Sequence, residues 1–510
     1  MTGNLHPRLV SILCGAIFMA GPAMAESHRS LGEADLTRIN ADYLPTADQV
    51  QDWHERKDSM GGTFSGSPSW HNYHDILETG FRQLGLVDIA MDSFSYTRWY
   101  SSDNPQDGQW TLEIDGEDIP VAAYWPYSGG TDAQGVTAEL VYYDRDNPPD
   151  IEGKIVVFDI PPMETVMPAR FRSAGYEYAT NPETLEESTL DQFYQIYYVT
   201  RFGRLHEVAQ KGKAAGGIIV FDMSPGRAAG LYAYPLPDEP TGVPGIFFDR
   251  IAGKKVMAAA LEGREATLTL LAKTEEVEPH FFAGYLPGRN YGQENDEIIL
   301  MLTHTDGPNI TQDNGGLGIL SVVHYFAQIP QELRPRTLLV LLDPQHFMPG
   351  RHPTDWYGLY PETSAKIVAS IGIEHLGQRG FTEIGDDFMP TGLPETMNVF
   401  VQDNDKLIEI AIQAVKDNNV PQVLVQSPPR GDQGQWHGLG EVALKRKLPG
   451  FGATSNMSAY WATAARIDKF DKDHFLKQAA LLAQLTGELM TADLDEIAPP
   501  VKQAETDVSH

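Results

Sequence analysis

The chain has 510 residues and a formal net charge of −32, with 70 acidic side chains against 38 lysines and arginines. This excess of negative charge makes nucleic acid and anionic membrane surfaces poor partners. The length exceeds that of one ordinary domain and predicts two or three domains.

Residues 1–25 have the pattern of a secretory signal peptide. Arg8 precedes an apolar run from Val10 to Ala20, and the small-residue pattern Ala23-Met24-Ala25 follows it, as at a signal cleavage site. We therefore expect an exported protein, periplasmic or secreted. The one cysteine, Cys14, lies inside this segment, so the mature chain forms no disulfide. No later apolar run is long enough to predict a membrane span.

Residues 26–105 are expected to form the N-terminal part of the main domain. A glycine-rich stretch, Met60 to Pro68, introduces a helical pattern from His71 to Leu84.

Residues 106–275 differ, because short β-rich runs alternate there with turn signals. The runs are Leu140 to Tyr143, Lys154 to Phe158 and Gly217 to Phe221. This region predicts a separate, mainly β domain.

Residues 276–490 alternate apolar strands with amphipathic helices, which is typical of βαβ units. The fold class is therefore α/β, with a mixed, mostly parallel sheet flanked by helices. The expected strands are Ile298 to Leu302, Thr337 to Leu342 and Ile367 to Ile373, and the expected helices are Gly316 to Phe326, Lys406 to Lys416 and Lys472 to Met490. The tail, residues 491–510, is polar and predicts disorder.

Polar residues follow three of the apolar strands. The first strand is followed by His304, Asp306 and Asp313, the second by Asp343, Gln345 and His346, and the third by Glu374 and His375. Ligands of open α/β sheets bind beyond the carboxyl ends of the strands, so His304, Asp313, His346 and Glu374 are expected to share one site. His304 and Asp313 can present an imidazole and a carboxylate to a divalent cation, while Asp306 orients the ring from behind.

These motifs resemble the secreted zinc aminopeptidase and glutamate carboxypeptidase family, whose bilobal members carry a protease-associated domain inserted ahead of the main zinc site. His304-x-Asp306 with Asp313-Asn314 is similar to the family's first metal motif. Gly153 to Val157, Ala214 to Val220 and Val243 to Phe248 resemble the inserted domain, and Tyr460 to Ala464 followed by Ile467 to Asp471 resembles the C-terminal segment. The resemblance covers most of the mature chain. It implies a zinc exopeptidase-like fold and amide or peptide substrates.

The chain departs from the family pattern at the catalytic positions. The family has two adjacent glutamates after the second strand, a general base and a zinc ligand, where this chain has Gln345 and His346. Glutamine cannot accept the proton of an attacking water, so the family's usual base is missing. Glu374 stands at the position of the family's aspartate ligand. The last histidine ligand aligns with Trp461, which cannot bind a metal.

The resemblance therefore implies one metal position rather than two, formed by His304, Asp313 and Glu374. His346 is either a fourth ligand or the base, and His375 is a second candidate base. Zinc suits this ligand set, as do manganese and iron. Gln345 is either a remnant or a hydrogen-bond donor to substrate. The remaining candidates for substrate binding are Asn314, Trp436, His437, Glu441, Tyr460 and Trp461.

Three functions remain open from the sequence. The first is a metallopeptidase-like hydrolase acting on a peptide or small molecule. The second is a non-catalytic relative that uses the fold for binding, and the third is a hydrolase or lyase for another substrate, such as a carbohydrate or small amide. The first metal motif also has a structural alternative, in which Asp313 only caps the helix that begins near Gly315. The oligomeric state is not indicated by the sequence.

Overall fold

The computed structural model describes most of the chain between residues 29 and 500. The described residues are 29–102, 107–160, 175–184, 205, 207–232, 241–349, 355–431, 433, 435–455, 462–464 and 466–500. The expected signal peptide and two of the substrate-binding candidates, Tyr460 and Trp461, lie outside them. Among the described helices, none combines the length and the apolar character needed to cross a membrane.

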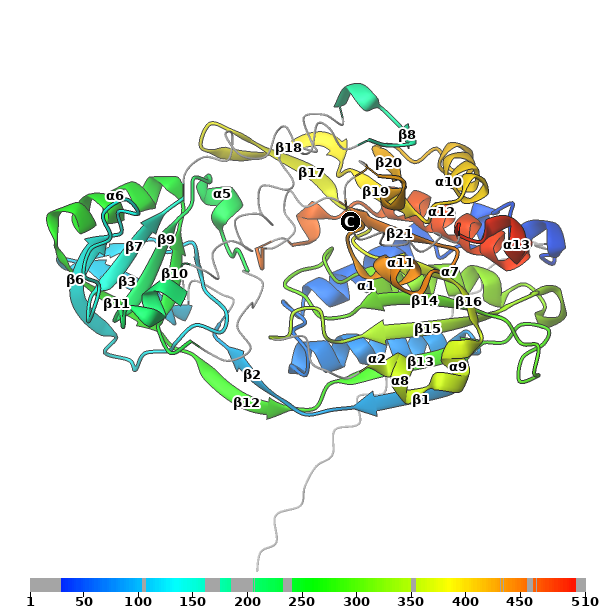
Figure 1. The fold of residues 1–510 in the computed structure, drawn as a ribbon, viewed down its shortest axis with the longest axis horizontal. Coiled ribbons are helices and arrows are strands. Elements are labelled where there is room, and N and C mark those ends of the chain that lie inside the picture. The colour runs from blue at the N-terminus through cyan, green and yellow to red at the C-terminus, as the bar shows by residue number, and fades with distance from the viewer. Residues whose placement is uncertain are drawn as a thin grey trace, which may run out of the picture.

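A nine-stranded mixed sheet forms the larger unit (Figure 1), with the order β1-β13-β15-β14-β16-β21-β19-β20-β8. Its four central strands run parallel to one another, and they are β15 (Thr337–Asp343), β14 (Ile298–His304), β16 (Ile367–Ile373) and β21 (Gly450–Ser455). Helices cover both faces of these strands, so nearly all of their residues are buried. Burial on both faces explains their continuous apolar sequences.

Antiparallel pairs extend the sheet on both sides of this centre. On one side lie β13 (His280–Leu286) and β1 (Val87–Ser93), and on the other lies β19 (Met397–Val401), which is antiparallel to β21. Beyond β19 lie β20 (Val423–Gln426), parallel to it, and β8 (Tyr178–Ala179). The expected mixed sheet flanked by helices is therefore confirmed, with its parallel pairs concentrated at the centre.

Two apolar layers enclose the central strands. One layer contains Ile299 and Met301 of β14 and is covered by helices, namely α1 (Ala47–Asp58), α2 (Pro68–Gln83), α7 (Gly315–Ala327), α10 (Asp405–Asp417) and α12 (Lys472–Thr491). The other layer contains Leu300 and Leu302, which pack near the short helices α8 (Trp356–Leu359), α9 (Pro361–Ala365) and α11 (Val442–Arg446). Alternate strand residues thus point to opposite layers.

The tail differs from the sequence prediction. Residues 494–497 form a short helix, α13 (Leu494–Ile497), whose first turn is capped by the side chain of Asp493. Ile497 is fully buried, and such burial contributes about 1.5–3 kcal/mol. The prediction of a disordered tail is wrong for these residues, because the apolar side chain of Ile497 packs into the core and holds an otherwise polar segment. Residues 501–510 lie outside the described residues.

A second sheet of eight strands is built from residues 110 to 270, with the order β4-β3-β11-β6-β7-β9-β10-β5 (Figure 1, left). Its strands are β3 (Trp110–Ile114), β4 (Glu117–Ile119), β5 (Ala123–Tyr124), β6 (Val136–Tyr142), β7 (Ile155–Asp159), β9 (Gly216–Val220), β10 (Gly245–Phe248) and β11 (Glu265–Leu270). The helices α5 (Pro225–Ala228) and α6 (Arg250–Glu262) accompany them, and the unit has its own apolar core. Its assignment as a protease-associated domain stays a prediction.

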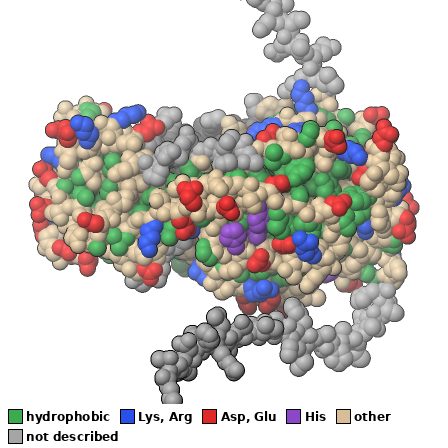
Figure 2. All heavy atoms as spheres, turned by 90° about the horizontal axis from the view of Figure 1, so that it is seen from below, with side chains coloured by type: hydrophobic (Ala, Val, Ile, Leu, Met, Phe, Trp, Pro, Cys, Tyr) green, Lys and Arg blue, Asp and Glu red, His purple; other side chains and the backbone are tan. Residues whose placement is uncertain are grey.

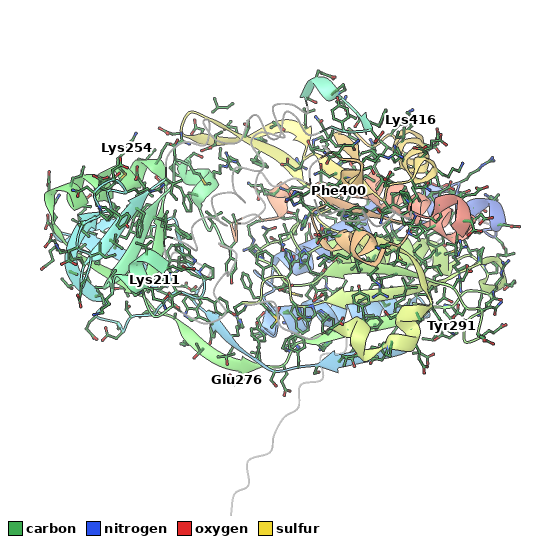
Figure 3. The ribbon with its side chains drawn as sticks, viewed as in Figure 1. Lys211, Lys254, Glu276, Tyr291, Phe400 and Lys416 are labelled. Carbon is green, nitrogen blue, oxygen red and sulfur yellow. The ribbon has the colours of Figure 1, made fainter. Side chains whose placement is uncertain are left out.

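Several segments join the second unit to the first, among them β8, which pairs with β20 of the nine-stranded sheet, and the bridge between Leu231 and Ala462. The chain leaves the main unit along β2 (Tyr96–Tyr100) and returns along β12 (Lys273–Val277), and these strands pair antiparallel. Glu276, labelled on β12 in Figure 3, accepts a hydrogen bond from the Thr97 hydroxyl. A hairpin of the main unit, β17 (Arg379–Ile384) and β18 (Asp387–Pro394), also reaches toward α5 in Figure 1.

Glu383 of this hairpin forms ion pairs with two arginines of the second unit. Arg227 Nη1 lies 2.8 Å from Glu383 Oε2, and Arg250 Nη2 lies 2.6 Å from Oε1. The Ser224 backbone N–H also donates to this carboxylate.

Acidic side chains are spread over the surface of both units, as Figure 2 shows for one face. Histidine side chains also gather near the middle of this face.

Candidate metal centre

Three polar side chains meet at the carboxyl ends of β14 and β16. His304 is the last residue of β14, and Glu374 and His375 directly follow β16. The Nε2 atoms of His304 and His375 lie 3.4 Å apart, and Glu374 Oε2 is 3.8 Å from the first and 3.7 Å from the second. All three side chains are buried. Within the described part of the chain, they are the one group of three with metal-binding side chains and ligand atoms within 4.8 Å of one another.

Hydrogen bonds behind the two imidazoles orient them toward this point. His304 Nδ1 lies 2.9 Å from the Asp306 carbonyl oxygen. Because a carbonyl oxygen only accepts, Nδ1 donates and the lone pair is left on Nε2. His375 Nδ1 lies 2.5 Å from the Thr454 hydroxyl on β21. Support of this kind is typical of histidines that bind metals.

Burial sets the charge of these groups. It lowers the pKa of His304 to about 4 and the pKa of His375 well below its usual value. Both rings are therefore neutral at neutral pH, which is the form that binds metal ions. Burial also raises the pKa of Glu374 to about 7, and the Leu439 backbone N–H, which donates to this carboxylate, opposes the rise.

The spacing of the three atoms fits a zinc ion. With zinc–ligand bonds of about 2.0–2.1 Å, the edge of a coordination tetrahedron is about 3.3 Å. The separations of 3.4, 3.8 and 3.7 Å are close to this edge. A neutral pair of imidazoles with one carboxylate is also a donor set that zinc accepts in catalytic sites.

The backbone at His375 explains how two consecutive residues reach one point. Successive residues of a strand point to opposite faces, so Glu374 and His375 would diverge in a regular strand. His375 instead has a φ of +56°, in the left-handed region that few residues other than glycine adopt. Asn314 holds the following residue, since its Oδ1 accepts from the Leu376 N–H at 2.9 Å and its Nδ2 donates to the Leu376 carbonyl at 2.8 Å.

Asn314, predicted as a substrate contact, has protein partners in the structure. Its side chain is fully buried, and its amide also lies 3.1 Å from His54 Nε2 on α1. The amide thus connects α1, the start of α7 and the segment after β16. These hydrogen bonds satisfy the buried amide of Asn314, so its burial requires no bound ligand.

Asp306 orients His304 as predicted, but through its backbone carbonyl. Its carboxylate accepts hydrogen bonds from three other segments: the backbone N–H of His346 at 3.1 Å, that of Phe347 at 2.6 Å and the Ser65 hydroxyl at 3.0 Å. Burial raises the pKa of Asp306 well above its usual value, and these donors oppose the rise. The carboxylate thus fixes the loop after β15 beside His304.

Asp313, predicted as a metal ligand, lies outside the group of His304, Glu374 and His375. Its Oδ1 forms an ion pair with the ammonium of Lys57 on α1, and its Oδ2 accepts from the Thr63 hydroxyl. Lys57 and Thr63 carry no motif that would have marked them in the sequence. Their contact with Asp313 arises from the packing of α1 and the segment after it against the loop before α7.

The residues after β15 lie beside the centre. The His346 ring stacks on that of His304, with centroids 4.2 Å apart and planes at 25°, and it is half-buried. The Gln345 backbone N–H donates to Asp343 Oδ1 at 2.8 Å. Burial raises the pKa of Asp343 to about 6. His346 thus contacts His304 of the centre directly.

The loop that carries Trp436, His437 and Glu441 approaches the centre through other residues. Trp436 packs on Phe400 of β19, labelled in Figure 3, with ring centroids 5.9 Å apart, and the His437 ring is 6.2 Å from the same ring. Glu441 pairs with Lys445 at 2.6 Å. Glu374 instead meets Leu439 N–H and Gly438, whose φ is +81° and where a Cβ would lie 2.7 Å from Glu374 Oε1.

Comparison with known proteins supports the fold. No protein-family model matches the sequence, and no curated protein matches it. Among solved structures, a peptidase M28 precursor from Shewanella amazonensis is similar over 92% of this chain and 100% of that chain, with 15% identity and a TM-score of 0.63.

Two aminopeptidases are similar as well. A zinc aminopeptidase from Bacillus subtilis has 14% identity and a TM-score of 0.56, over 89% of this chain and 98% of that chain. An aminopeptidase from Aneurinibacillus sp. strain AM-1 has 14% identity and a TM-score of 0.54, over 92% and 97%. At these identities the likeness concerns the fold, and it confirms the zinc exopeptidase-like architecture predicted from the sequence.

The contact between Thr454 and His375 predicts an effect on metal affinity. We expect Thr454→Val to weaken Zn²⁺ binding about 10- to 100-fold, because loss of a hydrogen bond behind a metal-binding histidine has this effect. Competition with a chromophoric chelator measures the affinity. Thr391→Val, on the exposed hairpin strand β18, is the control and should leave it unchanged. Equal affinities in the two variants would show that the hydroxyl does not hold the ring.

Proposed function

We propose that this protein is a metal-dependent hydrolase that binds one divalent cation, zinc, through His304, Glu374 and His375. The observation that carries the proposal is the convergence of two imidazole Nε2 atoms and one carboxylate oxygen at 3.4–3.8 Å. This set replaces Asp313 of the expected ligands by His375. The zinc aminopeptidases with a similar fold support zinc as the metal and amide or peptide bonds as the substrate class.

The residues around the centre have distinct roles in this proposal. A bound zinc ion supplies Lewis acidity to the substrate carbonyl and increases the acidity of water. Asp306 and Thr454 hold the rings of His304 and His375 in position. His346, half-buried and stacked on His304, accepts the proton of the attacking water, since Gln345 cannot. Peptides or small amides are the proposed partners, and nucleic acid is not.

A non-catalytic binding protein is the second candidate. The observation that favours it is Gln345, which occupies the position of the family's general base and whose backbone donates to Asp343. A centre with this residue can retain a metal and a substrate while lacking the usual proton acceptor. The two candidates therefore agree on metal binding and differ in turnover.

Metal analysis tests the centre itself. We expect the purified protein to contain about one equivalent of zinc, and His304→Ala and His375→Ala to bind it more than about 100-fold more weakly, because each removes a ligand rather than a supporting contact. Elemental analysis after dialysis against Zn²⁺ measures the content. His71→Ala, which changes an exposed histidine on α2, should retain the full equivalent. A wild-type protein without bound metal would refute the proposal.

A panel of aminoacyl anilides tests the reaction. We expect turnover by the wild-type protein, and a loss of about 10²-fold or more in kcat for His346→Ala, the size of effect typical of a general base. The fluorescence or absorbance of the released aniline measures the rate. If the wild-type protein is inactive on every substrate and Gln345→Glu is active, the natural protein is the binding relative. An active wild type with an equally active His346→Ala would remove the proposed base.

We also propose that the protein is exported, on the basis of the pattern in residues 1–25. Sequencing of the N-terminus of the protein recovered from periplasmic and secreted fractions tests this. Cleavage after Ala25 gives a mature chain that begins at Glu26 and has no cysteine. Recovery of the protein in the cytoplasm with Met1 in place would contradict it.

A further inference from the structure

A lysine is fully enclosed behind the candidate centre. The Lys57 side chain on α1 has no exposed surface, and its ammonium forms an ion pair with the Asp313 carboxylate. The ammonium also donates to the Asn309 carbonyl at 3.0 Å and lies 5.0 Å from the centroid of the Tyr73 ring. An ammonium removed from water is costly unless it is paired and hydrogen-bonded, so each of these contacts compensates its burial.

The helix α1 contacts the loop before α7 at two positions. His54 lies three residues before Lys57, on the same side of the helix, and its Nε2 is 3.1 Å from the Asn314 amide. Two consecutive residues of the loop, Asp313 and Asn314, are therefore each in contact with α1. The Thr63 hydroxyl donates to the other oxygen of Asp313. Both carboxylate oxygens of Asp313 thus have partners supplied by the protein.

We propose that Lys57 acts as an internal cation that neutralises Asp313, so that Asp313 is not a metal ligand and the centre binds one divalent cation instead of two. This inference rests on the proposed function for the identity of the centre. The charge balance supports it. Two neutral imidazoles and one carboxylate form the ligand set, while Asp313 and Lys57 together carry no net charge. A second divalent ion at Asp313 would face the ammonium directly, and like charges in a buried site repel strongly.

A double-mutant cycle on the metal-free protein tests the pairing. Lys57→Met and Asp313→Leu each leave one buried charge without its partner, whereas the double variant removes both charges and replaces them by apolar groups. We expect each single variant to have a lower midpoint of urea unfolding, and the double variant to recover most of the loss, as found when buried ion pairs are replaced by apolar residues. Lys211→Met removes an exposed ion pair with Glu207 on the second unit (Figure 3) and should have little effect.

Metal titration of the same double variant tests the ligand set. We expect one equivalent of zinc with a dissociation constant within about threefold of wild type, since losing a true ligand costs far more than the 10- to 100-fold typical of supporting contacts. The Co²⁺ derivative should keep its visible absorption spectrum, which reports coordination and does not follow stability. His375→Ala is the matched control, because it removes a proposed ligand and should lose this spectrum.

Each outcome decides one part of the inference. Additive effects of the two single variants would overturn the pairing. Two equivalents of zinc in the wild-type protein, or loss of zinc and of the Co²⁺ spectrum in a folded double variant, would overturn the claim that Asp313 is not a ligand. A wild-type protein that binds no metal would refute the proposed function and the metal count together, while the cycle on the metal-free protein would still decide whether Lys57 neutralises Asp313.

Discussion

The buried carboxylate of Asp306 is the constraint on which the arrangement of the centre depends. It accepts backbone N–H groups from the loop after β15 and a hydroxyl from Ser65, while its own carbonyl accepts from His304. A buried carboxylate is costly unless such donors surround it, so the fold must hold all of them in place. The end of β14, the loop after β15 and the segment before α2 are thereby fixed against one another, and His304 and His346 come to lie in contact.

The sequence predicted the features that depend on local patterns. The strand β16 has the bounds that its apolar run indicated, and α7 and α10 differ from prediction by one residue at each end. Continuous apolar runs are typical of parallel strands buried on both faces, which is why they could be recognised. The rule that strand ends converge predicted that His304 and Glu374 lie close together, and the structure brings their side chains within 3.8 Å.

The partners of these residues could not be predicted in the same way. Lys57 and Asp313 are separated by more than 250 positions, and their contact depends on how α1 packs, which no periodicity in either segment indicates. Asp313 and Asn314 have the residue types of a ligand and a substrate contact, yet the structure gives both of them protein partners. The left-handed backbone at His375 is equally invisible in a sequence without glycine there, and it is what turns a candidate base toward the candidate ligands.

The pairing of β2 with β12 is one of the attachments of the second unit. These two strands pair with each other where the chain enters and leaves that unit, while the chain between β7 and β9 returns to the nine-stranded sheet and pairs there as β8. The ion pairs of Glu383 with Arg227 and Arg250 stand at a separate contact between the units. The second unit is therefore attached at more than one place, and a rotation about the β2–β12 ladder would require the Glu383 ion pairs and the pairing of β8 with β20 to break.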